Sequence, residues 1–138
     1  MPNLPHLPHM PIMPIYAALL ALLFVYLSFR TIGARRRLQI ALGDKDHPEM
    51  QRAVRVHANF AEYVPLGLIL LHLVEARTPP MWLMHALCLL LLVGRLLHAY
   101  GVSQTPERFQ FRVSGMVMTF TCLIGSALYI LQGALRAV

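Results

Sequence analysis

The sequence predicts an all-α integral membrane protein, built as a bundle of four antiparallel transmembrane helices. Of its 138 residues, 57% are hydrophobic and 13% are charged, whereas roughly 25% are charged in a typical soluble domain. Four apolar runs follow one another along the chain, each close to the roughly 20 residues that a membrane-crossing helix needs. Because the connections between them are short, we expect consecutive helices to pack as neighbours in an up-down bundle.

Each expected span takes its limits from one apolar run. The first covers about 11–33, around PIYAALLALLFVYLSF, and the second covers 53–76, which ends in YVPLGLILLHLVEA. The third covers 80–100, PMWLMHALCLLLLVGRLLHAY, and the fourth covers 112–135, which contains VSGMVMTFTCLIGSALYILQGAL. Together they are expected to form one membrane domain, residues 14–138.

A proline-rich tail, residues 1–13, precedes this domain. Proline recurs at every third position from Pro2 to Pro14, and this period matches the three residues per turn of a polyproline II helix. We expect the tail to lead stiffly into the first span. Recognition by a proline-binding partner is the alternative interpretation.

The basic residues cluster beside the apolar runs and do not spread over a soluble face. This distribution is typical of juxtamembrane charge and argues against a nucleic-acid partner, although the formal net charge is +6. Lys and Arg concentrate in short cytoplasmic loops of membrane proteins, so we expect the first and third loops in the cytoplasm and both termini on the non-cytoplasmic side of an inner or plasma membrane. The residues that decide this are Arg30, Arg35, Arg36, Arg37, Lys45, Arg52, Arg55, Arg95, Arg108 and Arg112.

A polar stripe occupies one face of the second span, near its cytoplasmic end. Its members are spaced 3, 4 and 3 residues apart, which places them on one side of a helix. The third span carries an arginine and a histidine three residues apart near the same membrane surface, and the fourth begins with an arginine. We therefore expect these side chains to converge in the cytoplasmic half of the bundle: Arg52, Arg55, Asn59, Glu62, Arg95, His98 and Arg112.

The surplus of arginine in this group indicates what it could bind. A charged side chain in the middle of a membrane costs ~2.5–3.5 kcal/mol, so Glu62 is expected to find a partner among Arg55, Arg95 and Arg112. An ion-pair network that only holds the helices together would tend to balance its charges. The excess of cations favours a pocket for an anionic ligand, since arginine binds carboxylates through two hydrogen bonds.

Other polar and small residues inside the spans are interpreted as structural. Glu75 and the histidines near the outer end are expected to snorkel or to form one interhelical hydrogen bond. The two cysteines lack metal-ligand spacing, so we expect them to pack as small apolar residues and we expect no metal site. Small residues of the last span are expected to allow close helix packing. These residues are His72, Glu75, His85, Cys88, Cys122, Gly115, Gly125, Ser126 and Gly133.

Two segments, RAVRVHANFAEYVP and GRLLHAYG, make the chain resemble the MAPEG family, the membrane-associated proteins of eicosanoid and glutathione metabolism. The family's hallmark is an Arg-x-x-Arg-x-x-x-Asn-x-x-Glu stripe on the second helix, together with Gly-Arg-x-x-His on the third. A basic cluster follows the first helix, and an arginine opens the fourth. The resemblance covers nearly all of the chain except the proline-rich tail. The matching residues are Arg52, Arg55, Asn59, Glu62, Gly94, Arg95, His98 and Arg112.

The resemblance implies a homotrimer that binds glutathione, as a co-substrate, between neighbouring subunits near the cytoplasmic side. In active members the glutathione thiol attacks lipophilic electrophiles or reduces lipid hydroperoxides, which arrive from the bilayer. Carried over to this sequence, Arg112 would stabilise the nucleophilic thiolate. Glutathione itself would be held by Arg36, Arg52, Arg55, Asn59, Glu62, Arg95 and His98.

Three positions depart from family members whose chemistry is similar to that of prostaglandin synthase. Ala58 stands where those members have a further arginine, Val113 where a serine follows the fourth-helix arginine, and Met116 where a tyrosine is common. Some members bind lipid mediators without catalysis. A glutathione-dependent transferase or peroxidase is therefore the leading hypothesis, and a non-catalytic lipid-binding or scaffold trimer is the alternative. A small multidrug transporter is disfavoured because residues 10–29 contain no carboxylate.

Overall fold

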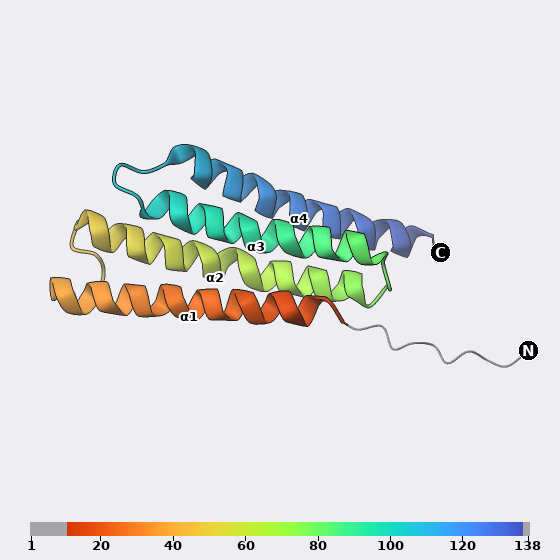
Figure 1. The fold of residues 1–138 in the computed structure, drawn as a ribbon, viewed down its shortest axis with the longest axis horizontal. Coiled ribbons are helices and arrows are strands. Elements are labelled where there is room, and N and C mark those ends of the chain that lie inside the picture. Colours follow the sequence, from red (N-terminus) through yellow and green to blue (C-terminus); the bar gives the residue numbers. More distant parts are fainter. Residues whose placement is uncertain (1–10, 137–138) are drawn as a thin grey trace, which may run out of the picture.

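Four long helices account for most of residues 11–136, the part of the chain that the structure, a computed structural model, describes. They are α1 (Met13–Leu38), α2 (Pro48–Glu75), α3 (Met81–Ser103) and α4 (Phe109–Leu135). They lie side by side and alternate in direction, so that α1 begins and α4 ends at the same end of the bundle (Figure 1). The prediction of an all-α bundle of four antiparallel helices is confirmed. Most of the proline-rich tail lies outside the described residues.

All four helices are long and apolar enough to cross a membrane. Large hydrophobic side chains on their outer surfaces are exposed, among them Leu22 (67%), Phe29 (68%) and Trp82 (71%). A soluble protein would bury such side chains, whereas lipid solvates them. The chain is therefore an integral membrane protein.

At the end of the bundle that carries most of the arginines, the helices continue beyond the apolar runs of the sequence. The first helix ends at Leu38 and is capped by Gln39, whose backbone is left-handed (φ 54°). The guanidinium of Arg35 then donates to the carbonyl oxygen of Gly43 at 2.9 Å and folds the connection back. The second helix starts with Pro48 in its first turn, where a missing N–H costs nothing.

The helices pack in the order of the chain, with α1 and α4 at the two edges (Figure 1). Within residues 11–136, α1 contacts α2 and α3 but not α4. The core between the helices is apolar, with Leu20, Leu71 and Leu91 fully buried. Both cysteines are buried and free, in agreement with a packing role.

The closest approach in the bundle is between α3 and α4. A Cβ atom placed on Gly115 would lie 2.5 Å from the carbonyl oxygen of Gly94 and 2.5 Å from the backbone nitrogen of His98. Only glycine fits there, which confirms the expectation of close packing at this position. At Gly125 an added Cβ would make an ordinary contact with Leu87, 3.4 Å away.

Polar side chains at the opposite end of the bundle connect α1 to α2 and α3. The carboxylate of Glu75 accepts hydrogen bonds from the backbone N–H groups of Ile12 (2.6 Å) and Met13 (2.8 Å), because the first turn of a helix leaves its N–H groups without partners. His85 bonds to the hydroxyl of Tyr16 at 2.9 Å. An interhelical hydrogen bond was expected at this end of the bundle. Glu75 and His85 each form a hydrogen bond to the first helix or its N-cap.

Candidate functional site

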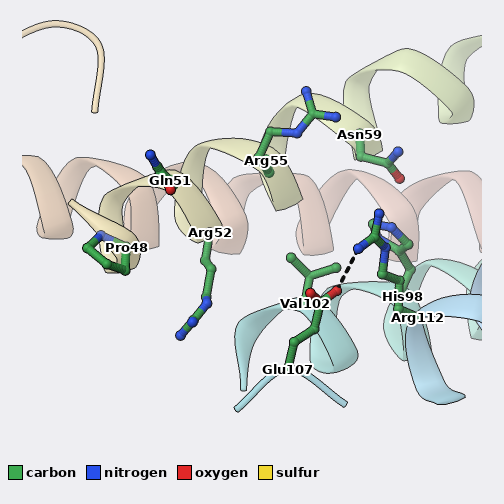
Figure 2. A pocket seen from close by; sticks show the side chains of 9 residues that line it. All are labelled: Pro48, Gln51, Arg52, Arg55, Asn59, His98, Val102, Glu107 and Arg112. Carbon is green, nitrogen blue, oxygen red and sulfur yellow. Dashed lines mark hydrogen bonds and ion pairs between the residues drawn. The ribbon is translucent and has the colours of Figure 1, made fainter. Parts of the chain in front are cut away.

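A polar cavity of about 280 Å³ opens at the arginine-rich end of the bundle, between α2 and the junction of α3 with α4. The α2 side is formed by residues spaced three and four apart, as the sequence predicts for one helix face. Figure 2 shows the side chains that line it. They are Pro48, Gln51, Arg52, Arg55, Asn59, His98, Val102, Glu107 and Arg112.

The opposite wall depends on a close junction between the end of α3 and the start of α4. A Cβ atom on Gly101 would lie 2.5 Å from the backbone nitrogen of Arg112, so glycine lets the two helices meet here. As a result Arg112, in the first turn of α4, lies beside His98, which is one turn before Gly101 (Figure 2). His98 is buried, with 5% of its surface exposed.

Arg95 lies behind the cavity rather than in its wall. It is 1% exposed, and its Nη1 donates to Oδ1 of Asn59 at 2.7 Å. Its Nε and Nη2 donate to the hydroxyl of Thr119 at 3.1 and 2.8 Å, and its guanidinium carbon lies 5.5 Å from the ring centre of Tyr63. Arg95 therefore fixes the amide of Asn59, and the NH₂ group of Asn59 donates to no other residue among 11–136, so it is available to a ligand in the cavity.

Thr119, the partner of Arg95 on α4, was not among the residues predicted for the site. Its hydroxyl donates to the carbonyl oxygen of Gly115 at 2.8 Å, and its lone pairs are therefore directed at the guanidinium. Met116 contributes a weaker acceptor, with its sulfur 3.3 Å from Nη2. The signal in the sequence is the position of Thr119 one turn after the close-packed Gly115, on the face of α4 that meets α3.

An ion pair lies inside the cavity. The Nη1 of Arg112 donates to Oε1 of Glu107 at 2.9 Å (Figure 2). Glu107 belongs to the short connection between α3 and α4, and Arg52 donates to the hydroxyl of Thr105 in the same connection. Glu107 was not predicted to belong to the site. The sequence indicates it only through its position five residues before Arg112.

The balance of charge in the cavity is positive. Three arginines and one carboxylate line it, and no residue of the wall other than Glu107 is acidic. Arg55 is exposed, and its guanidinium extends away from His98 and Arg112 (Figure 2). The expected surplus of arginine over carboxylate is therefore present. The carboxylate in the cavity is Glu107, however, and not the predicted Glu62.

Three of the predicted glutathione ligands do not line this cavity: Arg95, which is buried behind it, Arg36 and Glu62. Arg36 is exposed near the end of α1, and Glu62 is exposed one turn beyond Asn59 on α2. The expected ion pair of Glu62 is not found: the ion pairs within residues 11–136 are Arg37–Glu49 and Arg112–Glu107. The physical reason is that Arg95 and Arg112 already bind Asn59, Thr119 and Glu107, while Glu62 is exposed on the outer surface of the bundle.

Comparison with known proteins adds an independent result. Residues 13–132 match the MAPEG family. The chain is 35% identical over 102 residues to the inner membrane protein YecN of Escherichia coli strain K12. The aligned region covers 74% of this chain and 76% of that protein. The protein of the same name from Escherichia coli O6:H1 strain CFT073 matches with the same identity and coverage.

Proposed function

The chain belongs to the MAPEG family, and from this premise we propose that it is a membrane-bound, glutathione-dependent transferase or peroxidase. Its second substrates would be lipophilic electrophiles or lipid hydroperoxides that reach the site from the bilayer. The names of the relatives place them in an inner membrane. We propose the same location here, with both termini on the non-cytoplasmic side and the polar cavity near the cytoplasm.

The observation that carries this proposal is the charge of the cavity. Glutathione has two carboxylates and one ammonium group, and the cavity offers three arginines and one carboxylate. Arginine can bind a carboxylate through two parallel hydrogen bonds. The free NH₂ of Asn59 and the ring of His98 add neutral partners for the peptide groups of such a ligand.

The size of the cavity supports a site that is completed by a second subunit. Its volume of about 280 Å³ is just below the ~300–1,000 Å³ of most small-molecule pockets. Arg36 and Glu62, which the family resemblance assigns to glutathione, lie on the outside of the subunit. In a homotrimer these exposed residues would face a neighbouring chain, where they can contact the same ligand.

The proposed chemistry depends on Arg112. Its guanidinium, in the first turn of α4, would combine with the positive end of the helix dipole to favour the thiolate of bound glutathione. The thiolate sulfur then bonds to an electrophilic carbon, and the leaving group departs with the bonding electrons. With a hydroperoxide, the sulfur bonds to the terminal oxygen while the O–O bond breaks, which gives a sulfenic acid and, after protonation, an alcohol. A second glutathione then displaces water from the sulfenic acid and forms glutathione disulfide.

One observation favours the alternative, a non-catalytic lipid-binding or scaffold trimer. Arg112 is already paired with Glu107, so the cation that would stabilise the thiolate has a partner before any ligand binds. A protein that only binds its ligand does not need this arginine to be free.

A single set of assays separates the two functions. The protein is purified in detergent, and conjugation of glutathione to 1-chloro-2,4-dinitrobenzene and reduction of a lipid hydroperoxide are measured together with glutathione binding by calorimetry. Arg112→Ala is compared with Arg108→Ala, since Arg108 is exposed and does not line the cavity. An enzyme loses turnover in Arg112→Ala alone.

Two other results lead elsewhere. Glutathione binding without turnover by the native chain supports the binding protein. If glutathione does not bind, the proposed ligand is wrong for both functions.

A further inference from the structure

We propose that Glu107 determines the ligand specificity of the cavity by receiving the ammonium group of a zwitterionic ligand. In this proposal, which rests on the function proposed above, an anionic group of the ligand replaces Glu107 as the partner of Arg112. The released carboxylate of Glu107 then pairs with the ammonium of the same ligand.

The position of Glu107 is the first argument. Its carboxylate is the single acidic group in the wall of the cavity, and it lies 2.9 Å from Nη1 of Arg112. The side chains of Arg112 and Glu107 are 49% and 35% exposed, so an entering ligand can reach both. A carboxylate accepts several hydrogen bonds, which leaves Glu107 with acceptor capacity beyond the bond from Arg112.

The connection that carries Glu107 is held in place from both sides. The backbone N–H of Arg108 donates to the carbonyl oxygen of Gly101 at 3.1 Å, and Arg52 on α2 bonds to Thr105. Glu107 lies between these two contacts. The backbone on both sides of Glu107 is therefore anchored, while its partly exposed carboxylate lines the cavity.

Exchange of ion pairs makes the site selective. An anion that takes over Arg112 leaves the carboxylate of Glu107 without its partner and close to a like charge, which is unfavourable. A ligand that carries an ammonium restores the lost pair, whereas a purely anionic ligand does not. The arrangement thus favours zwitterions such as glutathione and disfavours simple anions such as fatty acids, because specificity is a difference between two affinities.

Other acceptors in the cavity do not fit this role as well. The Oδ1 of Asn59 already accepts from Arg95 and is uncharged, so it attracts an ammonium less strongly than a carboxylate does. Gln51 offers only a neutral amide oxygen. Glu62, the acidic residue of the α2 stripe, is exposed and lies outside the cavity wall of its own chain. Only the Glu62 of a neighbouring subunit could compete with Glu107 for the ammonium, and the Glu107→Gln variant tests this.

The test compares two ligands that differ by one group. Binding of glutathione and of glutaryl-cysteinyl-glycine, which lacks the ammonium, is measured by calorimetry on the full chain in detergent. Three proteins are used: the native chain, Glu107→Gln, and Glu49→Gln as a matched control, because Glu49 pairs with Arg37 outside the cavity. We expect the native chain and Glu49→Gln to prefer glutathione by about tenfold, and Glu107→Gln to retain no more than about a twofold preference.

Several outcomes would overturn the inference. If Glu107→Gln keeps the full preference, another group binds the ammonium. If it strengthens the binding of both ligands equally, Glu107 only competes for Arg112. If the native chain binds the two ligands equally well, the ammonium is not recognised, and this result leaves the proposed function intact. If the native chain binds neither ligand, the proposed function fails, and the inference fails with it.

Discussion

Arg95 on α3 donates a hydrogen bond to Asn59 on α2, with 2.7 Å between Nη1 and Oδ1. The two residues belong to the two sequence motifs on which the family resemblance depends. Both were expected to contact the ligand, but only Asn59 lines the cavity. Arg95 is buried behind it and holds the amide in position, so this motif arginine is a positioning residue.

The first prediction concerns this buried arginine. We expect Arg95→Lys to lower the free energy of unfolding by about 2 kcal/mol or more, because a lysine cannot replace the fork of hydrogen bonds to Asn59 and Thr119. Glutathione affinity should fall as well, since the amide of Asn59 is no longer fixed. Thermal unfolding in detergent and calorimetry measure the two effects. Arg77→Lys, on an exposed residue of the outer end, is the control and should change neither.

The second prediction concerns the contact of α3 with α4. Gly115→Ala places a methyl group 2.5 Å from both the carbonyl oxygen of Gly94 and the nitrogen of His98, so the helices must separate. We expect a loss of about 1–3 kcal/mol and a displaced His98. Gly125→Ala, ten residues along the same helix, meets only Leu87 at 3.4 Å and should change stability by no more than about 0.5 kcal/mol. Equal melting temperatures for both variants would show that the close contact does not limit stability.

The third prediction concerns the outer end of the bundle. Glu75→Ala removes the acceptor for the backbone N–H groups of Ile12 and Met13. We expect the free energy of unfolding to fall by about 1 kcal/mol, the usual effect of losing a helix cap. Glu75→Gln keeps one acceptor oxygen and should retain most of the stability. Glutathione binding should be unaffected in both variants, because the site lies at the other end of the bundle; a loss of binding would contradict this separation.

The sequence was sufficient for the helices and for one wall of the site. Apolar runs of membrane-spanning length predict four helices whatever their neighbours are, and short connections predict their alternating direction. The spacing of Arg52, Arg55 and Asn59 predicts that they share one face of α2, and all three line the cavity. These features depend on one helix at a time, which is why periodicity captures them.

The partners across helices were not predictable in the same way. Glu62 belongs to the same stripe as Asn59, but it lies one turn farther along α2, where it is exposed and does not line the cavity. Its predicted role as the carboxylate of the group is taken by Glu107, which lies in a connection and follows no helical spacing. The partner of Arg95, Thr119, depends on how closely α4 approaches α3 at Gly115. These pairings are set by helix packing, which the apolar pattern alone does not determine.

The fourth prediction tests whether neighbouring subunits share the site. Arg36 is exposed and does not line the cavity that contains Arg112 of its own chain. If Arg36 contacts a ligand in the neighbour's cavity, Arg36→Ala and Arg112→Ala each abolish activity when expressed alone. If the protein forms the proposed homotrimer, about a quarter of the sites in random mixed trimers then combine an intact Arg112 with an intact Arg36 from the next chain.

We therefore expect co-expression of Arg36→Ala and Arg112→Ala to restore glutathione conjugation, or glutathione binding if the protein is not an enzyme, to about a quarter of the native level. The control pair is Asn59→Ala with Arg112→Ala. Both of these residues line the cavity of one chain, so every subunit in the mixture carries a defective wall and no recovery should occur. If the Arg36 mixture recovers no more than this control, Arg36 does not act across a subunit boundary, and the ligand must be held by residues of a single chain.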